Sequence, residues 1–203
     1  CYLTINIFAH NEDIEPLTKY LETVREIDID AFIVSDPGIV DLIQEIIPDA
    51  EIHLSTQANM TNYRTANFWH KMGVERLVLA RELTFKEIKE IRKNIPEEME
   101  LEAFVHGAMC MAYSGRCTLS NYMTNRDSNR GGCSQVCRFA FETDEEKKFT
   151  MATKDLNMAT HIKDLIEIGV KSFKVEGRMR SIYYLATVIS SYRKLIDSYY
   201  DNK

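Results

Sequence analysis

Residues 76–107 have the sequence RLVLARELTFKEIKEIRKNIPEEMELEAFVHG, and this stretch decides the fold that we expect. Two β-rich runs, Arg76–Ala80 and Glu102–Val105, flank a segment in which isoleucine recurs at the spacing of one helix face. The helix is expected to begin at Thr84–Glu87, which has the form of a capping box. The isoleucines are Ile88, Ile91 and Ile95. The stretch therefore predicts one strand–helix–strand unit.

The same alternation continues on both sides of this unit, with a β-rich run about every 25 residues through the first half of the chain. In chain order the runs are Leu3–Phe8, Ala31–Val34, Glu51–Leu54, Arg76–Ala80, Glu102–Val105 and Ser172–Val175. Amphipathic helical patterns separate most of them, so the sheet is expected to be parallel with helices outside it. No glycine-rich dinucleotide fingerprint follows an early strand, which favours a (β/α) barrel over an open doubly wound sheet.

The expected fold is α/β, a TIM-barrel-like (β/α) repeat that forms one domain over residues 1–203 and is incomplete at the N-terminus. The chain opens at Cys1 directly within a strand pattern, which indicates a piece of a longer protein. The six strands would then be the later part of an eight-stranded closure, and an open barrel would leave an exposed strand edge. A final helix is expected after Gly177, with one apolar stripe. Its members are Ile182, Leu185, Ala186, Ile189, Tyr192 and Ile196.

The composition is that of an ordinary globular protein, with 45% hydrophobic and 28% charged residues. No apolar run approaches the ~18 residues of a membrane span and no basic-then-apolar leader is present, so we expect a cytoplasmic protein without membrane contact. The net charge of −6 argues weakly against a general nucleic-acid coat protein.

The segment Cys110–Arg138 differs from the rest of this acidic chain, because it carries four arginines and one aspartate. Such a basic island favours a local docking face for phosphate. The alternative is that the arginines compensate thiolates or pair with nearby acids. The arginines are Arg116, Arg126, Arg130 and Arg138.

Four of the five cysteines are crowded into the same segment, at the spacing C-x6-C-x15-C-x3-C. They are Cys110, Cys117, Cys133 and Cys137. In a chain without a secretory signal, this crowding favours a metal or cluster site over two disulfides. Four thiolates suit an iron–sulfur cluster or a structural zinc ion, and the spacing does not choose between them. Buried or incidental thiols are the third interpretation.

The stretch Ala108–Lys148 is too long for an ordinary βα loop, so we expect a cysteine-rich insertion with its own organisation. Within it, Asn129–Gly132 predicts a tight turn that presents Arg130. The run Arg138–Ala152 predicts a hairpin with a charged tip.

Polar side chains gather where the expected strands end, and in a barrel these positions line the active-site mouth. Arg81 and Glu82, for example, follow the fourth strand together. The candidates for substrate or RNA contacts are Gln57, Arg81, Lys174, Glu176 and Arg178 at strand ends, with Arg126, Arg130 and Arg138 from the cysteine-rich segment.

Glu102 and His106 are the candidates for catalysis. Glu102 shares its strand face with Phe104 and is expected to point into the barrel, where burial would raise its pKa and suit acid–base chemistry. The alternative is a buried carboxylate paired with a cation such as Lys174. His106 is either a general base or RNA contact, or a satisfied histidine at a strand end. Cys110 would be the candidate thiol nucleophile if no metal held it.

Residues 102–120 have the pattern Glu102-x-Phe104-x-x-Gly107-Ala108-Met109-Cys110, four residues, then Gly115-x-Cys117-x-Leu119-Ser120. This pattern resembles the signature of peptidase family U32, the collagenase-like peptidases. Further similar segments, from TINIFAHNED near the start to FKVEGRMRSIYYLATVISSYR near the end, extend the resemblance over nearly the whole chain. The resemblance implies a TIM-like barrel whose relatives carry two more strand–helix units ahead of Cys1.

The branch of this family with the cysteine-rich motif includes enzymes that hydroxylate RNA, at a tRNA wobble uridine or an rRNA cytidine, and others that hydroxylate a quinone precursor. The resemblance implies an iron–sulfur cluster of the 4Fe-4S type on the four cysteines, with prephenate as a companion metabolite. We therefore expect iron–sulfur-dependent hydroxylation of RNA, above all tRNA. The alternatives are a collagenase-like peptidase that cleaves protein through Glu102 or His106, and a non-catalytic RNA- or protein-docking scaffold with a structural metal.

Overall fold

The computed structural model describes residues 1–201, and its centre is a sheet in which six strands run parallel. In spatial order they are β1 (Tyr2–Ile5), β2 (Ala31–Val34), β3 (Ile52–Leu54), β4 (Val74–Val78), β5 (Glu100–Gly107) and β9 (Ser172–Val175). Every neighbouring pair along this order is parallel. The predicted α/β repeat is therefore confirmed, although the strand bounds shift by a few residues.

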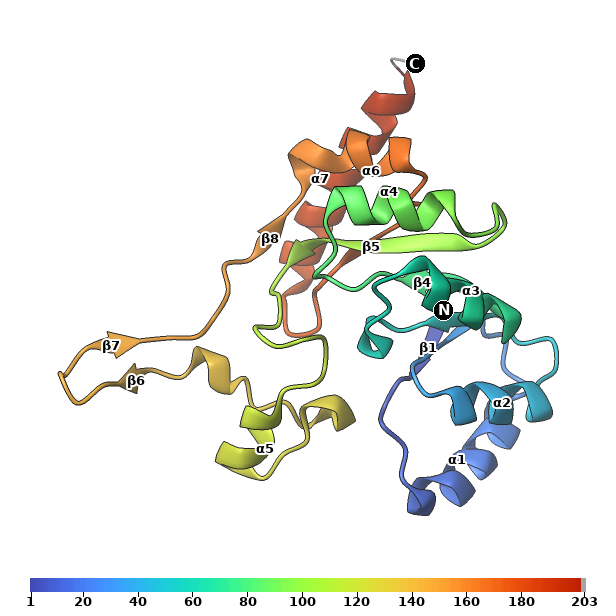
Figure 1. Ribbon diagram of the computed structural model, residues 1–203, viewed down its shortest axis with the longest axis horizontal. Coiled ribbons are helices and arrows are strands. Elements are labelled where there is room, and N and C mark those ends of the chain that lie inside the picture. Colours follow the sequence, from blue (N-terminus) through green and yellow to red (C-terminus); the bar gives the residue numbers. More distant parts are fainter. Residues whose placement is uncertain (202–203) are drawn as a thin grey trace.

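Helices follow the parallel strands along the chain and pack on the sheet (Figure 1). They are α1 (Asn11–Val24), α2 (Pro37–Ile46), α3 (Tyr63–Lys71), α4 (Phe85–Lys93), α6 (Ile162–Ile168) and α7 (Ile182–Asp201). Neighbouring helices contact one another in the pairs α1–α2, α3–α4, α4–α6 and α6–α7, and the core lies between them and the sheet. In the described part of the chain, no helix has both the length and the apolar character needed to cross a bilayer.

Local sequence signals set where these helices begin. Asp36 caps α2 by accepting a hydrogen bond from Gly38 N at 2.8 Å, and Pro37 occupies the first turn. The predicted capping box of α4 is present, because Thr84 N donates to Glu87 Oε2 at 2.7 Å and Glu87 N donates to Thr84 Oγ1 at 3.4 Å. These side chains satisfy backbone groups that the helix itself leaves without partners.

Two contacts across the sheet show that it is strongly curled. Arg76 on β4 donates from Nη1 to the Tyr2 hydroxyl on β1 at 3.0 Å, although β2 and β3 lie between the two strands. In a flat sheet these strands would lie about 14 Å apart, at ~4.8 Å per strand. Beyond the strand ends, Asn6 Nδ2 donates to Ser55 Oγ at 2.9 Å. The sheet is therefore a half-barrel, and among the described residues β1 and β9 do not pair to close it.

Strand β5 carries a change of register near its end. It pairs with β9 from Glu102 to His106, and the register shifts between Phe104 and His106. The short strand β8 (Leu156–Asn157) pairs antiparallel with the same end of β5. Such an irregularity redirects the side chains that follow it. It explains the position of His106 described below.

The chain between β5 and β8 forms a separate layer with its own structure. It contains α5 (Thr118–Thr124), short helical turns, and the hairpin of β6 (Phe141–Glu142) and β7 (Lys148–Phe149). The predicted hairpin is therefore confirmed, and Figure 1 shows that it projects away from the rest of the chain. Within residues 108–148, all of which are described, Val136 is the only buried hydrophobic residue. Polar contacts must therefore hold this segment in place.

The last helix differs from the prediction. The expected apolar stripe on α7 is only partly buried, since Tyr192 is 6% exposed but Ile182 and Ile189 are 87% and 51% exposed. The Tyr192 hydroxyl donates to Val105 O on β5 at 2.8 Å, which fixes the middle of the helix against the sheet. Neighbouring elements cover only part of α7, and the pattern of apolar residues alone does not show how much is covered.

Candidate active site

The cysteine-rich segment, residues 108–148, contacts the carboxyl ends of the parallel strands through buried polar side chains. In (β/α) barrels these strand ends form the active-site mouth. Ser114 and Asn129 of the segment are 0% and 6% exposed, and both form hydrogen bonds with residues that follow strands. The segment that carries the cysteines is therefore docked on the side of the half-barrel where chemistry is expected.

Asn129 connects the segment to the ends of β1 and β3. Its Oδ1 accepts a hydrogen bond from Phe8 N, and its Nδ2 donates to Gln57 Oε1 and, at 3.5 Å, to Asn6 O. The side chain of Gln57, a predicted substrate contact, is thus engaged within the protein. Gly115 permits this approach, because a Cβ at that position would lie 3.0 Å from the Gln57 side chain.

Ser114 connects the segment to β4. Its Oγ accepts hydrogen bonds from Arg81 Nε at 3.1 Å and from Arg81 Nη2 at 3.0 Å, and Thr56 Oγ1 lies 3.3 Å away. The Arg81 guanidinium also lies over the Phe104 ring, 5.3 Å from its centroid. Arg81, predicted as a substrate contact, therefore joins the interior of the half-barrel to the cysteine-rich segment.

Replacing Asn129 by alanine is expected to loosen this docking. The change leaves Phe8 N and the Gln57 amide without their partner, and each buried group left unsatisfied costs about 1–3 kcal/mol. We expect faster hydrogen exchange across residues 108–148 and faster tryptic cleavage there, with the sheet protected as in the wild type. Asn121→Ala is the matched control, because the Asn121 amide bonds only to Asp127 inside the segment. Equal exchange in both variants would contradict the docking role of Asn129.

The four cysteines of the segment are free thiols, and three of them lie near enough to Cys137 to affect its pKa. Burial raises the pKa of the Cys137 thiol, Arg138 opposes this rise, and the neighbouring Cys110, Cys133 and Cys117 add to it. Arg138, predicted as a phosphate contact, also donates from Nη1 to Cys137 Sγ at 3.3 Å. The other three cysteines therefore lie within electrostatic range of Cys137, which is a looser arrangement than shared ligation of one metal requires.

The donor set fits an iron–sulfur cluster or a zinc ion by its chemistry, since four soft thiolates are the preferred ligands of both. Over residues 1–201, however, no three Cys, His, Asp or Glu side chains already converge as metal ligands. The cysteine site thus stays a prediction, supported by the proximity of the four thiols.

Arg130 does not extend to solvent from the Asn129–Gly132 turn as predicted. It forms a two-pronged ion pair with Asp13 on α1, with Nη1 and Nη2 at 2.7 and 2.8 Å from the two carboxylate oxygens. Nη1 also donates to Phe8 O at 2.8 Å. Hydrogen bonds from Arg130, then from the His10 backbone, hold the pKa of Asp13 well below its usual range. The alternative of an arginine paired with a nearby acid is the one that the structure supports here.

Arg126 and Arg178 flank the glycine turn that precedes Cys133. A Cβ at Gly132 would lie 3.4 Å from Arg126 Cβ, and a Cβ at Gly131 would lie 3.9 Å from Arg178 Nη2. The two arginines come from the cysteine-rich segment and from the loop after β9. The fold therefore brings these two predicted RNA contacts to the same turn, next to the cysteine quartet.

The loop after β9 passes close to the end of β5. Gly107 has a φ of +106°, and a Cβ there would lie 2.6 Å from Glu176 O. Only glycine fits at such a position. The Glu176 carboxylate accepts a hydrogen bond from Arg178 N at 3.1 Å. Glu176, another predicted contact, therefore shapes the loop that carries Arg178.

Glu102 is a structural ion-pair residue in this fold. It is 4% exposed on the concave face, where Lys174 Nζ lies 2.8 Å from Oε1 and Ser172 Oγ donates to Oε2 at 2.7 Å. Burial acts to raise its pKa, but Lys174, Ser172 and Arg76 outweigh burial and lower the pKa of Glu102 below its usual value. The expected rise is therefore wrong, and the alternative pair with Lys174 is confirmed.

His106 faces α7 because of the register shift in β5. Its Nδ1 lies 3.3 Å from the Tyr192 hydroxyl, and its ring packs edge-on against Tyr192 and tilted against Tyr184. The structure supports the satisfied strand-end histidine rather than a general base at the barrel mouth.

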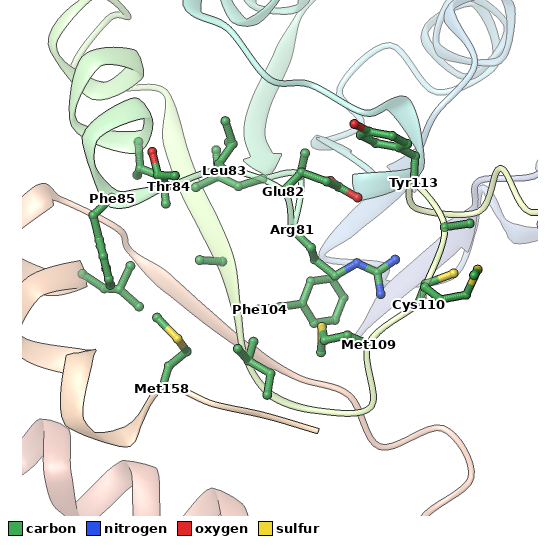
Figure 2. Close-up of a pocket in the computed structure, with 18 residues that line it drawn as sticks. Arg81, Glu82, Leu83, Thr84, Phe85, Phe104, Met109, Cys110, Tyr113 and Met158 are labelled. Carbon is green, nitrogen blue, oxygen red and sulfur yellow. The ribbon is translucent and has the colours of Figure 1, made fainter. Parts of the chain in front are cut away.

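A cavity opens at the carboxyl ends of β4 and β5, between α4 and the cysteine-rich segment (Figure 2). Its volume is about 610 Å³. Arg81, Glu82, Phe104 and Cys110 are among its lining residues, so it adjoins both the strand ends and the cysteine quartet. A small ligand, or part of a larger one, would fit in this space.

The sequence predictions missed the residues that dock the segment and most of those that line the cavity. Ser114 and Asn129 are buried and dock the segment on the strand ends. Ser114 precedes Gly115 and Asn129 precedes Arg130, and the predictions used the glycine and the arginine rather than these two polar residues. Met109 and Tyr113 line the cavity together with residues that lie far from them in the chain. The signal available for Ser114 and Asn129 is a small polar residue beside a glycine or an arginine in a long loop. No local pattern predicts that Met109 and Tyr113 line the cavity.

Comparison with known proteins gives relatives over the whole chain. The model of "Peptidase family U32" matches residues 1–203. The tRNA hydroxylation protein P1 of Bacillus subtilis is 46% identical over 98% of this chain and 50% of its own length, and the tRNA hydroxylation protein P of Escherichia coli is 37% identical over 97% and 55%. The 23S rRNA 5-hydroxycytidine C2501 synthase of Escherichia coli is 34% identical over 97% and 30%. The chain thus spans about half the length of the first two curated relatives.

One solved structure gives an independent check of the fold. The U32 peptidase Mk0906 superimposes with a TM-score of 0.56, covering 89% of this chain and 70% of that chain at 12% sequence identity. At this identity the likeness concerns the fold alone. It supports the half-barrel described above.

Proposed function

This chain belongs to peptidase family U32, and from that premise we propose that the complete protein hydroxylates a pyrimidine base in RNA, most of all in tRNA. The observation that carries the proposal is the cysteine quartet docked at the strand ends of a half-barrel whose named relatives hydroxylate tRNA and rRNA. The expectation of RNA as the substrate rests on the same relatives.

The four cysteines, Cys110, Cys117, Cys133 and Cys137, would hold the iron–sulfur group of this proposal. Replacing a ring C–H bond by C–OH adds one oxygen atom and removes two electrons from the nucleoside, so the reaction needs an external oxidant. A bound iron–sulfur cluster would supply the electron-transfer chemistry that amino-acid side chains lack. Arg138 donates to Cys137 Sγ, and a hydrogen bond to a ligating sulfur tunes the reduction potential of such a group. Zinc remains the alternative occupant.

The basic side chains beside the quartet support an RNA substrate. Arg126 and Arg178 flank the Gly131–Gly132 turn and form no ion pair within the described residues. Guanidinium groups in this position suit the phosphates of a nucleic acid, which position the chain without reading its sequence. Arg130 is excluded from this role by its pairing with Asp13.

The peptidase alternative lacks a supporting site. Its two candidate residues are engaged elsewhere, since Glu102 pairs with Lys174 and His106 contacts Tyr192. Cys110 is not hydrogen bonded to His106 in the structure, so no thiol–imidazole pair is formed. Prephenate as a companion metabolite stays a prediction from the family resemblance.

Nucleoside analysis tests the proposed function. Deleting the complete gene in its own organism is expected to remove a hydroxylated pyrimidine from bulk tRNA, measured by liquid chromatography and mass spectrometry, and a plasmid copy should restore it. A partial loss points to a second enzyme with the same product, in which case the double deletion completes the loss. Unchanged hydroxylated nucleosides in tRNA and rRNA would exclude RNA hydroxylation and favour a docking scaffold.

A further inference from the structure

The cavity between β4 and β5 exists because these strands separate toward their carboxyl ends. They pair only where Arg76–Val78 faces Glu100–Glu102, after which the chain turns toward α4 while β5 continues to Gly107. The volume of about 610 Å³ lies within the range of about 300–1,000 Å³ typical of small-molecule sites. The space therefore follows from the sheet geometry, at the position where a barrel enzyme binds its substrate.

One side of the cavity is apolar. Figure 2 shows Phe85 and Met158 on that side, with Phe104 and Met109 nearer the cysteine-rich segment. Aromatic rings and thioethers favour contact with a flat unsaturated ring. A nucleobase is such a ring, and every base offers a face that stacks on aromatic side chains.

The opposite side carries a donor and an acceptor. Arg81 binds Ser114 through Nε and Nη2, which leaves its Nη1 without a partner in the described part of the chain. Glu82 is exposed, and over the same residues its carboxylate has no hydrogen bond or ion pair. Figure 2 shows both side chains on the side of the cavity where Tyr113 and Cys110 lie. The rim therefore offers one free cationic donor and one free anionic acceptor.

The geometry points to this cavity as the binding site of the target pyrimidine base, after the base has left the RNA stack. The inference rests on the proposed function and adds where the base binds and which residues recognise its edge. Uracil presents an N–H donor between two carbonyl oxygens, so Glu82 accepts from the N–H while Arg81 donates to a neighbouring oxygen. Enzymes that act on a paired or stacked base extrude it into a pocket of this kind. Because Cys110 lines the same cavity, the bound base lies beside the cysteine quartet.

Alanine variants of the rim residues test the inference by product formation. Glu82 and Tyr113 are exposed, the latter by 65%, so Glu82→Ala and Tyr113→Ala in the full-length protein should leave folding and metal content unchanged. Hydroxylated nucleoside in tRNA from cells that carry Glu82→Ala is expected to fall about tenfold or more, the factor that corresponds to one lost hydrogen bond. Tyr113→Ala removes an aromatic ring from the rim of the cavity and is expected to lower the nucleoside as well. Glu90→Ala, an exposed glutamate on α4 that does not line the cavity, is the matched control. Wild-type levels in Glu82→Ala would overturn recognition by this carboxylate.

A photocrosslink adds a readout that does not depend on turnover. An anticodon stem–loop RNA with 4-thiouridine in its loop is irradiated with the full-length protein, and the modified peptides are identified by mass spectrometry. Adducts are expected within residues 79–85 or 109–113, and they should weaken in Glu82→Ala. Adducts confined to residues 126–138 would overturn the inference and leave RNA as the substrate. Adducts in the cavity without hydroxylated nucleoside in wild-type cells would instead overturn the proposed function and keep the base site.

Discussion

The full-length protein with Cys117 replaced by serine is expected to lose its iron and its RNA hydroxylation together. The four cysteines lie close enough for three of them to act on the pKa of Cys137, and a cluster held by four thiolates loses an entire ligand in this variant. Even loss of an outer-shell partner costs about 10–100-fold in metal affinity, so we expect a fall of more than about tenfold in bound iron. Iron, acid-labile sulfide and visible absorption are measured after purification without oxygen, and tRNA nucleosides are measured in the same cells.

Cys1→Ser is the matched control for this experiment. Cys1 is an exposed free thiol that lies outside the cysteine-rich segment, so its replacement removes a sulfur without touching the quartet. It should keep wild-type iron and wild-type hydroxylation. If the wild-type protein contained zinc but no iron or sulfide, the cysteines would form a structural zinc site and not a redox site. Full iron content in Cys117→Ser would show that this thiol is not a ligand.

The βα repeat was predictable because its signals are local. The run Arg76–Ala80 and the capping box Thr84–Glu87 define β4 and the start of α4 from consecutive residues, and the structure places both elements there within a few positions. The curl of the sheet was not predictable in this way. It is set by contacts such as Arg76 with Tyr2, which lie far apart in the chain and meet only once four strands are assembled. Sequence periodicity thus predicts the strands and helices, whereas long-range contacts accompany the curvature of the sheet.

The candidate site was predictable where a residue's role depends on its own strand. Side chains alternate between the two faces of β5, so the sequence already indicated which face Glu102 shares with Phe104. It also offered Lys174 as the partner of Glu102, which the structure confirms. For His106 the sequence offered both a general base and a satisfied strand-end histidine, and it could not choose between them because the register shift after Phe104 is not visible in the order of residues. Arg130 could not be placed from the sequence because its partner, Asp13, lies on a distant helix. The cysteine spacing predicts a four-thiol site, which stays a prediction, and it gives no sign of the polar contacts that dock the segment.

Replacing Glu102 by glutamine is expected to destabilise this chain by about 3 kcal/mol, since removing one partner of a buried ion pair leaves the other charge uncompensated. Glu102 is 4% exposed, whereas the Lys174 side chain is 30% exposed and keeps part of its hydration, which places the expected cost at the lower end for such pairs. The free energy of unfolding in urea at pH 7 measures the change. The double variant Glu102→Gln/Lys174→Met should recover most of the loss, because it leaves no unpaired charge.

The pH dependence separates this structural role from acid–base catalysis. Lys174, Ser172 and Arg76 together lower the pKa of Glu102 in the folded state despite its burial, so the unfolded chain binds this proton more readily. The stabilisation is therefore fully present above the unfolded pKa of about 4.5 and is lost as the pH falls through the lower folded value. Glu102→Gln should flatten the stability curve in that acid range and leave the pH profile of RNA hydroxylation unchanged in shape. A hydroxylation profile that lost its acid limb, at unchanged stability, would instead make Glu102 a proton-transfer group.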